Sequence, residues 1–279
     1  MRGFKCELRS RSVAKRLLRI ANCELIGDFL MSQLAIACND VETAYHPSLK
    51  RPILNGIDCQ IQQGEFVALL GLNGAGKSTL LRAFVGLIPL QRGKIHINGM
   101  AVTKQSLFLT RHHVGMLFQG GGLIRQLSAM DNVLCGRLGE LSAWRTLWGF
   151  PRRDRHLALE LLAQLGLQDL AYQKTSQLSG GQQQRVAIAR CLIQSPQILL
   201  ADEPITGLDA IASQQVMETL SQLHSQQGMT IVTVLHDLNL AAAYAERAIV
   251  LDAGRVVYDG SCENLPAQFS QVVGTRGEW

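Results

Sequence analysis

Eight consecutive residues of this chain have the composition of a loop that binds phosphate groups. They follow the pattern G-x-x-x-x-G-K-[ST] and read Gly71-Leu72-Asn73-Gly74-Ala75-Gly76-Lys77-Ser78. The glycines allow consecutive backbone N–H groups to point into one concavity, and a helix that starts there adds a dipole that favours anions. We expect Lys77 to reach the β- and γ-phosphates of a nucleotide, Ser78 to bind Mg²⁺, and Thr79 to lie near the α- and β-phosphates.

Two adjacent carboxylates follow a short apolar run that is typical of a buried strand. The run is Ile198–Ala201, and the carboxylates are Asp202 and Glu203. In open α/β sheets ligands bind at the carboxyl ends of the strands, and the apolar run Phe66–Leu70 also ends at the phosphate loop. We therefore expect Asp202 to hold Mg²⁺ through water and Glu203 to polarise an attacking water. The alternative is a pair of solvated loop charges.

A histidine occupies a similar place after a third predicted strand. His236 directly follows Thr230–Leu235, a run of mostly β-branched residues. A single histidine is more often structural or exposed than catalytic. Its position at a strand end nevertheless favours a hydrogen bond from His236 to the γ-phosphate, where it would help to orient the attacking water.

A second segment with exposed backbone N–H groups lies more than 90 residues after the phosphate loop. It reads Leu178-Ser179-Gly180-Gly181-Gln182 and opens a predicted helix. Serine is a good N-cap, and the glycines leave the N–H groups accessible. By local physics alone, this segment is better described as a capped helix start than as a binding site.

These residues require a sheet that brings several strand ends together. Predicted strands and helices alternate through the chain, which favours a largely parallel sheet. The segment from about 120 to 175 interrupts this alternation and predicts a helical subdomain, whereas Lys94–Ile97 followed by Asn98-Gly99 predicts a hairpin. The expected fold is thus α/β with a largely parallel sheet and a helical subdomain. The family resemblance given below implies, more specifically, a P-loop NTPase core with a mixed, largely parallel sheet, an antiparallel β subdomain and a helical subdomain. The expected helices are Lys77 to about Leu87, the residues after Ser179 to Ile193, Ala210–Gln226 and Leu238–Ala245.

The composition limits the possible partners and the number of domains. The chain has 279 residues, of which 47% are hydrophobic, and a formal net charge of +5. Seven of its basic residues but only three acidic ones lie within residues 1–30, so the remainder is close to neutral. We therefore expect no nucleic-acid partner. No run of 18 apolar residues occurs, so no membrane span is predicted.

The charge distribution gives the first of the expected domain boundaries. Residues 1–31 form a basic N-terminal extension, residues 32–265 the ATPase domain, and residues 266–279 a C-terminal tail. We expect the extension to be a disordered tail, or the start of the protein to be Met31. The alternative is a short basic amphipathic helix at Val13–Ile20 that contacts a membrane.

The cysteines indicate a reducing compartment. Their number is seven, and they contain no C-x-x-C pair. This argues against a disulfide framework and against a zinc site. We expect several of them to be small buried apolar side chains.

Together these motifs resemble the ATP-binding subunits of ABC transporters. The segment Leu178–Gln182 resembles the signature sequence of that family, and it lies about 20 residues before Asp202 and Glu203, as it does there. The resemblance extends over roughly residues 32–262. It implies that Tyr45 stacks on adenine and that Gln119 contacts Mg²⁺ and links the core to the helical subdomain.

The resemblance also implies an assembly. ATP would lie between two subunits, with the phosphate loop of one facing Ser179, Gly180, Gly181 and Gln182 of the other, and Asp209 at the interface. The second subunit would most simply be another copy of this chain. The implied cofactors are ATP and Mg²⁺. The other implied partners are a separate transmembrane permease and a periplasmic substrate-binding protein, with this chain on the cytoplasmic face of the inner membrane.

Within the family, the chain most resembles the ATPases that import phosphonates. The features that carry this resemblance are Asn132-Val133-Leu134, Gly136-Arg137-Leu138-Gly139, Trp144, Leu147, Gly149-Phe150, Asp154 and the more widely shared stretch 182–190. This implies phosphonate, or a related oxyanion such as phosphite, as cargo.

Three segments depart from the pattern of that subfamily. Gly120-Gly121-Gly122 replaces bulkier residues, Thr206-Gly207 replaces a small residue and a serine, and 236–241 looks more like the metal-chelate importers. A metal-chelate importer of the siderophore type is therefore the alternative. A soluble ABC ATPase that acts on DNA or ribosomes is disfavoured, because the chain has a single cassette and no sustained heptads.

Overall fold

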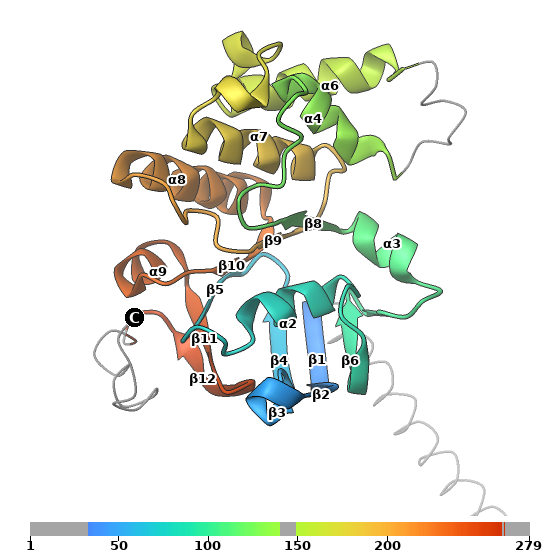
Figure 1. Ribbon diagram of the computed structural model, residues 1–279, viewed down its shortest axis with the longest axis vertical. Coiled ribbons are helices and arrows are strands. Elements are labelled where there is room, and N and C mark those ends of the chain that lie inside the picture. Colours follow the sequence, from blue (N-terminus) through green and yellow to red (C-terminus); the bar gives the residue numbers. More distant parts are fainter. Residues whose placement is uncertain (1–32, 140–148, 264, 266–279) are drawn as a thin grey trace, which may run out of the picture.

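The computed structural model describes residues 33–139, 149–263 and 265 (Figure 1). The expectations for the N-terminal extension, for Trp144 and Leu147, and for the C-terminal tail beyond residue 265 lie outside the described residues. Over the described ranges, no helix is both long and apolar enough to cross a membrane.

The main sheet is mixed and largely parallel, which confirms the predicted fold class. Its strand order is β12-β11-β5-β10-β9-β8. The five strands β11, β5, β10, β9 and β8 pair in parallel with their neighbours in that order. In this sheet β12, at the edge, is antiparallel to β11. The strands are β5 (Phe66–Gly71), β8 (Val114–Leu117), β9 (Ile198–Ala201), β10 (Thr230–Val234), β11 (Arg247–Asp252) and β12 (Arg255–Ser261).

The central strand β5 is apolar throughout because both of its faces are covered. Phe66, Ala68 and Leu70 pack in a cluster with the larger helices, whereas Val67 and Leu69 pack in a second cluster with α2 and the antiparallel sheet. Alternate side chains of a strand point to opposite faces, so a strand between two layers needs apolar residues at every position.

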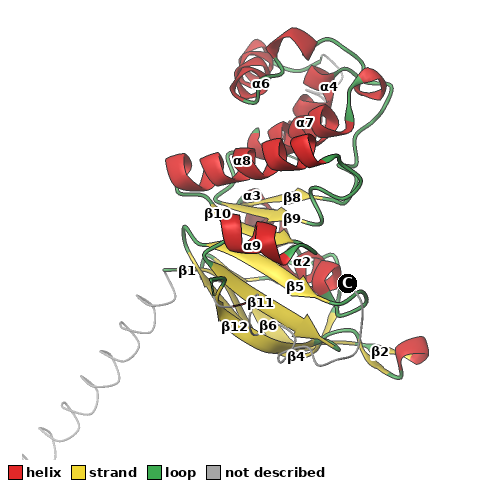
Figure 2. Cartoon of the chain, turned by 90° about the vertical axis from the view of Figure 1, so that its left-hand side faces the viewer, coloured by secondary structure: helices red, strands yellow, loops and turns green. Residues whose placement is uncertain are grey.

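The antiparallel β subdomain forms a second sheet below the main one (Figure 2). Its order is β4-β1-β6-β7, and a separate short hairpin is formed by β2 and β3. Tyr45 was expected in a loop but begins this hairpin, opposite Pro52. The strands are β1 (Leu34–Thr43), β2 (Tyr45–His46), β3 (Arg51–Pro52), β4 (Asn55–Gln62), β6 (Leu90–Ile97) and β7 (Met100–Ala101).

The helices divide between the two halves of Figure 1. The upper half contains α4, α6, α7 and α8, and the region below the main sheet contains α2. The helix α2 ends at Phe84, three residues earlier than expected, and Gly86 then adopts a positive φ of 64°. The helices are α2 (Lys77–Phe84), α3 (Leu107–His112), α4 (Ala129–Leu134), α6 (Arg152–Gln164), α7 (Gly180–Leu192), α8 (Ala210–Gln227) and α9 (Leu238–Tyr244).

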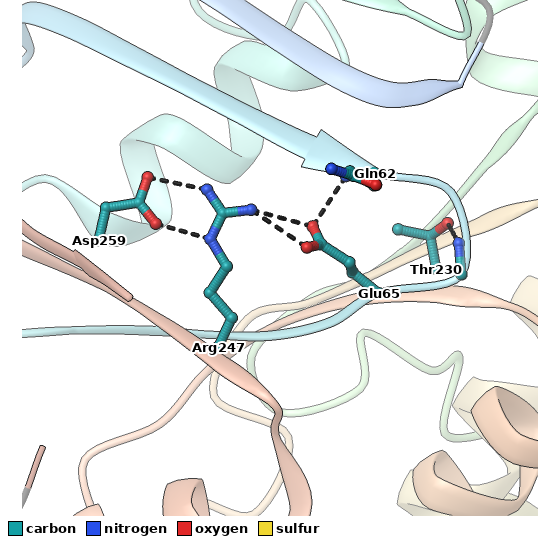
Figure 3. A network of polar contacts seen from close by, with 6 residues as sticks. Gln62, Glu65, Thr230, Arg247 and Asp259 are labelled. Carbon is teal, nitrogen blue, oxygen red and sulfur yellow. Dashed lines mark hydrogen bonds and ion pairs between the residues drawn. The ribbon is translucent and has the colours of Figure 1, made fainter. Parts of the chain in front are cut away.

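An ion-pair network fastens the amino ends of the parallel strands (Figure 3). Arg247, at the start of β11, donates to both carboxylate oxygens of Asp259 on β12, at 2.6 and 2.9 Å, and to those of Glu65 before β5, at 3.1 and 3.2 Å. The hydrogen bond to Asp259 is the main cause that raises the pKa of Arg247. The network lies at the amino ends of β5 and β11, whereas the catalytic groups are predicted at the carboxyl ends of the strands. We therefore assign it a structural role.

Candidate active site

Four neighbouring strands deliver the predicted catalytic groups to one edge of the sheet. In the order β5-β10-β9-β8, the carboxyl ends lead to the phosphate loop, to His236, to Asp202 and Glu203, and to Gln119. These segments are up to 165 residues apart in the chain, between positions 71 and 236. Parallel pairing of adjacent strands is therefore what brings them together.

The phosphate loop requires glycine where its backbone passes close to neighbouring strands. A Cβ at Gly71 would collide with the carbonyl oxygen of Leu251 on β11, and Gly71 also has a φ of +141°. At Gly76, with a φ of +108°, a Cβ would lie 3.1 Å from the carbonyl oxygen of Ile53. No side chain caps the first turn of α2 and no acidic residue lies in it, so its N–H groups are suited to an anion.

Lys77 lies across the loop that precedes it. Its ammonium group donates to the carbonyl oxygens of Gly71, at 2.6 Å, and Leu72, at 3.2 Å, and the residue is buried. Burial lowers the pKa of Lys77, while the carboxylates of Glu203 and Asp202 oppose that shift. The lysine is therefore a cation in a partly desolvated site, where its attraction for phosphate is stronger than in water.

Asp202 and Ser78 form an oxygen-rich pair that fits Mg²⁺. The hydroxyl of Ser78 donates to Oδ1 of Asp202 at 2.7 Å. Asp202 is 1% exposed, and its Oδ2 has no hydrogen-bond partner among the described residues. Among the same residues, no group of three or more His, Cys, Asp or Glu side chains is arranged so that it could hold a metal ion by itself. A hard cation that takes one carboxylate, one hydroxyl and phosphate oxygens suits this set, whereas zinc does not.

Glu203 is held by three donors from three different segments. His236 Nε2 lies 3.0 Å from Oε1, while Gln119 Nε2 and Thr206 Oγ1 donate to Oε2 at 2.7 and 3.1 Å. The backbone of Glu203 has a positive φ of 52°, which is rare for a residue with a side chain. The structure thus gathers Lys77, Asp202, Glu203 and His236 at one strand edge, and it places the amide of Gln119 on the carboxylate of Glu203 rather than beside Ser78 and Asp202.

The pKa of Glu203 is set by opposing influences. Burial is the largest single influence and raises the pKa. The hydrogen bonds from His236 and Thr206 and the charges of His236 and Lys77 lower the pKa, and together they outweigh burial. The pKa therefore lies below its ordinary value, and the side chain is a carboxylate at neutral pH. A carboxylate that is hydrogen-bonded at a strand end is suited to accept a hydrogen bond from a water molecule.

The remaining predicted residues lie apart from this cluster. Ser179 caps α7 and forms a capping box with Gln182, and this helix lies in the upper half of Figure 1, opposite α2. Asp209 caps α8, where its Oδ1 accepts a hydrogen bond from the backbone of Ala212 at 2.8 Å. Tyr45 is 61% exposed on the β2–β3 hairpin. All three are open to a second molecule or to a ligand base.

Three residues near the cluster were not predicted as site residues. Arg82 on α2 lies 3.6 Å from Oδ2 of Asp202, and Arg51 donates to the carbonyl oxygen of Gly74 in the phosphate loop at 3.4 Å. Thr206 contacts Glu203, and its only signal in the sequence was a departure from the subfamily pattern. Arg82 could have been found from its place one helical turn after Ser78, because residues four apart share a helix face.

A cavity of about 480 Å³ lies near the segment that follows Gln119. It is bordered by the end of α2, by β8 and by the end of α7. Phe118, Gly122, Cys135 and Arg190 are among its lining residues. The exposed side chain of Leu87 adds an apolar edge.

Comparison with known proteins agrees with this geometry. Residues 54–206 match the ABC transporter family. The chain is 72% identical over 239 residues to a phosphonates import ATP-binding protein of Nostoc sp., covering 86% of this chain and 98% of that protein. It is 45% identical to the protein of that name from Lactobacillus delbrueckii subsp. bulgaricus, covering 76% and 85%.

Among solved structures, the chain resembles the ATP-binding cassette MJ0796, a dimer in a post-hydrolysis state bound to ADP and Pi. The sequence identity is 33%, the TM-score is 0.70, and the match covers 82% of this chain and 99% of the cassette.

Proposed function

The chain belongs to the ABC transporter family, and on that premise we propose that it is the ATP-hydrolysing subunit of an importer for phosphonates or a related oxyanion. The identity of the cargo is supported by the 72% sequence identity to a phosphonates import ATP-binding protein over 86% of the chain. The observation that carries the chemistry is the gathering of Lys77, Asp202, Glu203 and His236 at one edge of the sheet.

The residues divide the work of hydrolysis. The phosphate loop and Lys77 would bind the phosphates of ATP, and Ser78, Asp202 and Gln119 would hold Mg²⁺. When bound, Mg²⁺ would neutralise charge on the phosphate oxygens. Glu203 would orient and polarise the attacking water, with His236 fixing its carboxylate through the contact at Oε1.

A second copy of the chain is the simplest partner for the start of α7. One chain carries two helix starts, at α2 without a side-chain cap and at α7 with Ser179 as its cap, in opposite halves of the molecule. An ATP molecule between two copies could contact the α2 donors of one and the α7 donors of the other. Its affinity would then favour the closed dimer over separate subunits, and hydrolysis would reverse this.

A separate permease is the proposed partner at the membrane. The family resemblance implies that the Gln119 region and the helical subdomain grip it, and the cavity of about 480 Å³ borders both. With such a permease, the chain would lie on the cytoplasmic face of the inner membrane, and a periplasmic substrate-binding protein would act on the other side. One feature favours a metal chelate as cargo instead, namely the stretch 236–241.

Reconstitution in vesicles tests the function and the cargo separately. The chain would be assembled with a candidate permease and a candidate phosphonate-binding protein from the same organism. We expect ATP hydrolysis to rise when the binding protein is loaded with methylphosphonate. Stimulation by a binding protein loaded with chelated iron, but not with methylphosphonate, would identify a metal chelate as the cargo. Absence of any hydrolysis would refute the proposal that the chain is an ATPase.

A further inference from the structure

Three consecutive glycines with left-handed backbone follow Gln119. Gly120, Gly121 and Gly122 have φ values of +70°, +72° and +58°. Residues with a side chain rarely adopt this conformation, so three in succession require glycine or pay a free-energy cost at each position. The segment therefore has a backbone path that few other sequences could follow.

Arg190 fixes this path from the last turn of α7. Its Nη1 donates to the carbonyl oxygen of Gly122 at 2.7 Å, and its Nη2 donates to that of Gly121 at 2.6 Å. Such a two-pronged contact of a planar guanidinium sets both position and orientation, which a lysine could not do. The first residue of the segment is Gln119, which donates to Glu203 at 2.7 Å.

The segment 119–122 is thus held at two points. Glu203 binds the side chain of Gln119, and Arg190 binds the carbonyl oxygens of Gly121 and Gly122. We propose that Arg190 is a positioning residue, which fixes the glycine segment and thereby holds Gln119 against the catalytic carboxylate. A shift of Arg190 would displace the carbonyls of Gly121 and Gly122 and, through the short connection, the amide of Gln119.

The position of Arg190 makes this contact accessible to the permease, an extension that rests on the proposed function. Arg190, Gly122 and Phe118 all line the cavity of about 480 Å³ next to the helical region. A permease segment in that cavity would touch the guanidinium or the carbonyls that it binds. The catalytic Glu203 would then respond to a partner that it does not contact.

A buried amide on α7 lies beside the glycine segment. Gln184 on α7 lies against Gly121, with its Oε1 3.4 Å from the place where a Cβ of Gly121 would be. The amide nitrogen of Gln184 is buried and finds no hydrogen-bond partner within the described part of the chain. A buried donor without a partner is costly, and a rotation of the glycine carbonyls could satisfy it.

Arg190→Met tests the proposal, because methionine keeps an apolar stem but donates no hydrogen bonds. The matched control is Arg185→Met, on the same helix, where the guanidinium donates to the carbonyl oxygen of Leu165 at 3.1 Å. In the nucleotide-free protein, we expect amide hydrogen exchange of residues 118–123 to quicken roughly tenfold in Arg190→Met and to stay unchanged in the control. We expect kcat for ATP to fall roughly tenfold with KM nearly unchanged, and Arg190→Lys to restore part of it.

The outcomes separate the proposal from its alternatives. Exchange at residues 118–123 as slow as in the native protein would overturn it, as would an equal acceleration over the whole chain. The exchange measurement needs no ATP, so it tests Arg190 even if the native protein hydrolyses no ATP. Absence of hydrolysis by the native protein would refute the proposed function and not the role of Arg190.

A backbone variant covers the case in which Arg190→Met does not fold. Gly122→Ala meets no atom closer than Arg190 Nη2 at 3.7 Å, but it strains a φ of +58°. Its control is Gly228→Ala, which strains a φ of +64° in open space at the end of α8. Faster exchange at residues 118–123 in Gly122→Ala alone supports the proposal, and equal behaviour of the two variants contradicts it.

Discussion

At the scale of single residues, Glu203 concentrates the chemistry of the site. Its carboxylate accepts from His236, Gln119 and Thr206, and its backbone has a φ of +52°. A left-handed conformation costs about 1 kcal/mol for a residue with a side chain. Such strain persists only where surrounding contacts determine the conformation. Here these contacts come from three segments and fix the direction of the carboxylate.

Replacing the carboxylate by an amide should separate binding from turnover. We expect Glu203→Gln to lower ATP hydrolysis at least about 100-fold, because the amide cannot polarise water. ATP affinity should stay close to the native value, since the phosphate loop and Lys77 are untouched. Phosphate release and titration with a fluorescent nucleotide measure the two quantities. Glu218→Gln, on the exposed face of α8, is the control, and undiminished turnover in Glu203→Gln would remove Glu203 from its role.

The hydroxyl of Thr206 should contribute to turnover through Glu203. Thr206→Val keeps the shape of the side chain but loses the donor to Oε2, and we expect kcat to fall about threefold to tenfold. Thr206→Ser keeps the hydroxyl and should retain most of the activity. Steady-state hydrolysis of both variants makes the comparison, with Thr219→Val on α8 as a matched loss of an exposed hydroxyl. Equal rates for valine and serine at position 206 would contradict this role.

At the scale of elements, a buried amide joins α4 to the loop after Gln119. Asn132 on α4 is 0% exposed, and its Oδ1 accepts from the backbone N–H of Ile124 at 2.8 Å. Its Nδ2 donates to the carbonyl oxygens of Ile124 and Ser128, both at 3.0 Å. A buried polar side chain with these partners fixes the loop to the helix, because any separation leaves buried groups unpaired.

Removing that amide should destabilise the whole protein. We expect Asn132→Ala to lower the free energy of unfolding by about 2–3 kcal/mol, because the N–H of Ile124 loses its partner and alanine leaves part of the buried site empty. The carbonyl of Ile124 keeps the hydroxyl of Thr175 as a donor, at 3.0 Å. Urea denaturation of the nucleotide-free protein measures this. Asn39→Ala, at an exposed position of β1, should change it by less than about 0.5 kcal/mol. A similar small change in both variants would show that the loop does not depend on Asn132.

At the scale of the whole molecule, buried thiols should make the free energy of unfolding fall as the pH becomes alkaline. Burial raises the pKa of Cys191 and of Cys262 from an ordinary value of 9.0 to about 11. A thiol is neutral below its pKa, and the folded interior favours this neutral form. The contribution of each thiol is therefore complete below pH 9, and it is lost as the pH rises through about 11.

Substitution of one thiol should flatten this loss. Between pH 9 and pH 11, we expect the native free energy of unfolding to decline, and Cys191→Ala to remove up to about 2.7 kcal/mol of the decline. Each protein is compared with itself at pH 8, which cancels the cavity that alanine leaves. Urea denaturation at several pH values gives the slopes. Parallel slopes for the native protein and the variant would mean that the pKa of Cys191 is the same in the folded and unfolded states.

Much of the site could be read from the sequence because its signals are local. The phosphate loop, the carboxylates after an apolar run and the histidine after a β-branched run each lie within a few residues, and hydrophobic periodicity alone located the strands that end at them. The largely parallel sheet and the helical subdomain followed from the alternation of predicted strands and helices, whereas the antiparallel sheet followed from the family resemblance.

Only the tertiary structure decided which side chains meet. That Gln119 and Glu203 share a hydrogen bond depends on β8 pairing with β9, and that His236 joins them depends on β10 pairing between β5 and β9. Strand order and register arise from packing between residues far apart in the chain, which no local pattern records. For the same reason, the contacts of Thr206 and Arg190 became visible only in the folded molecule.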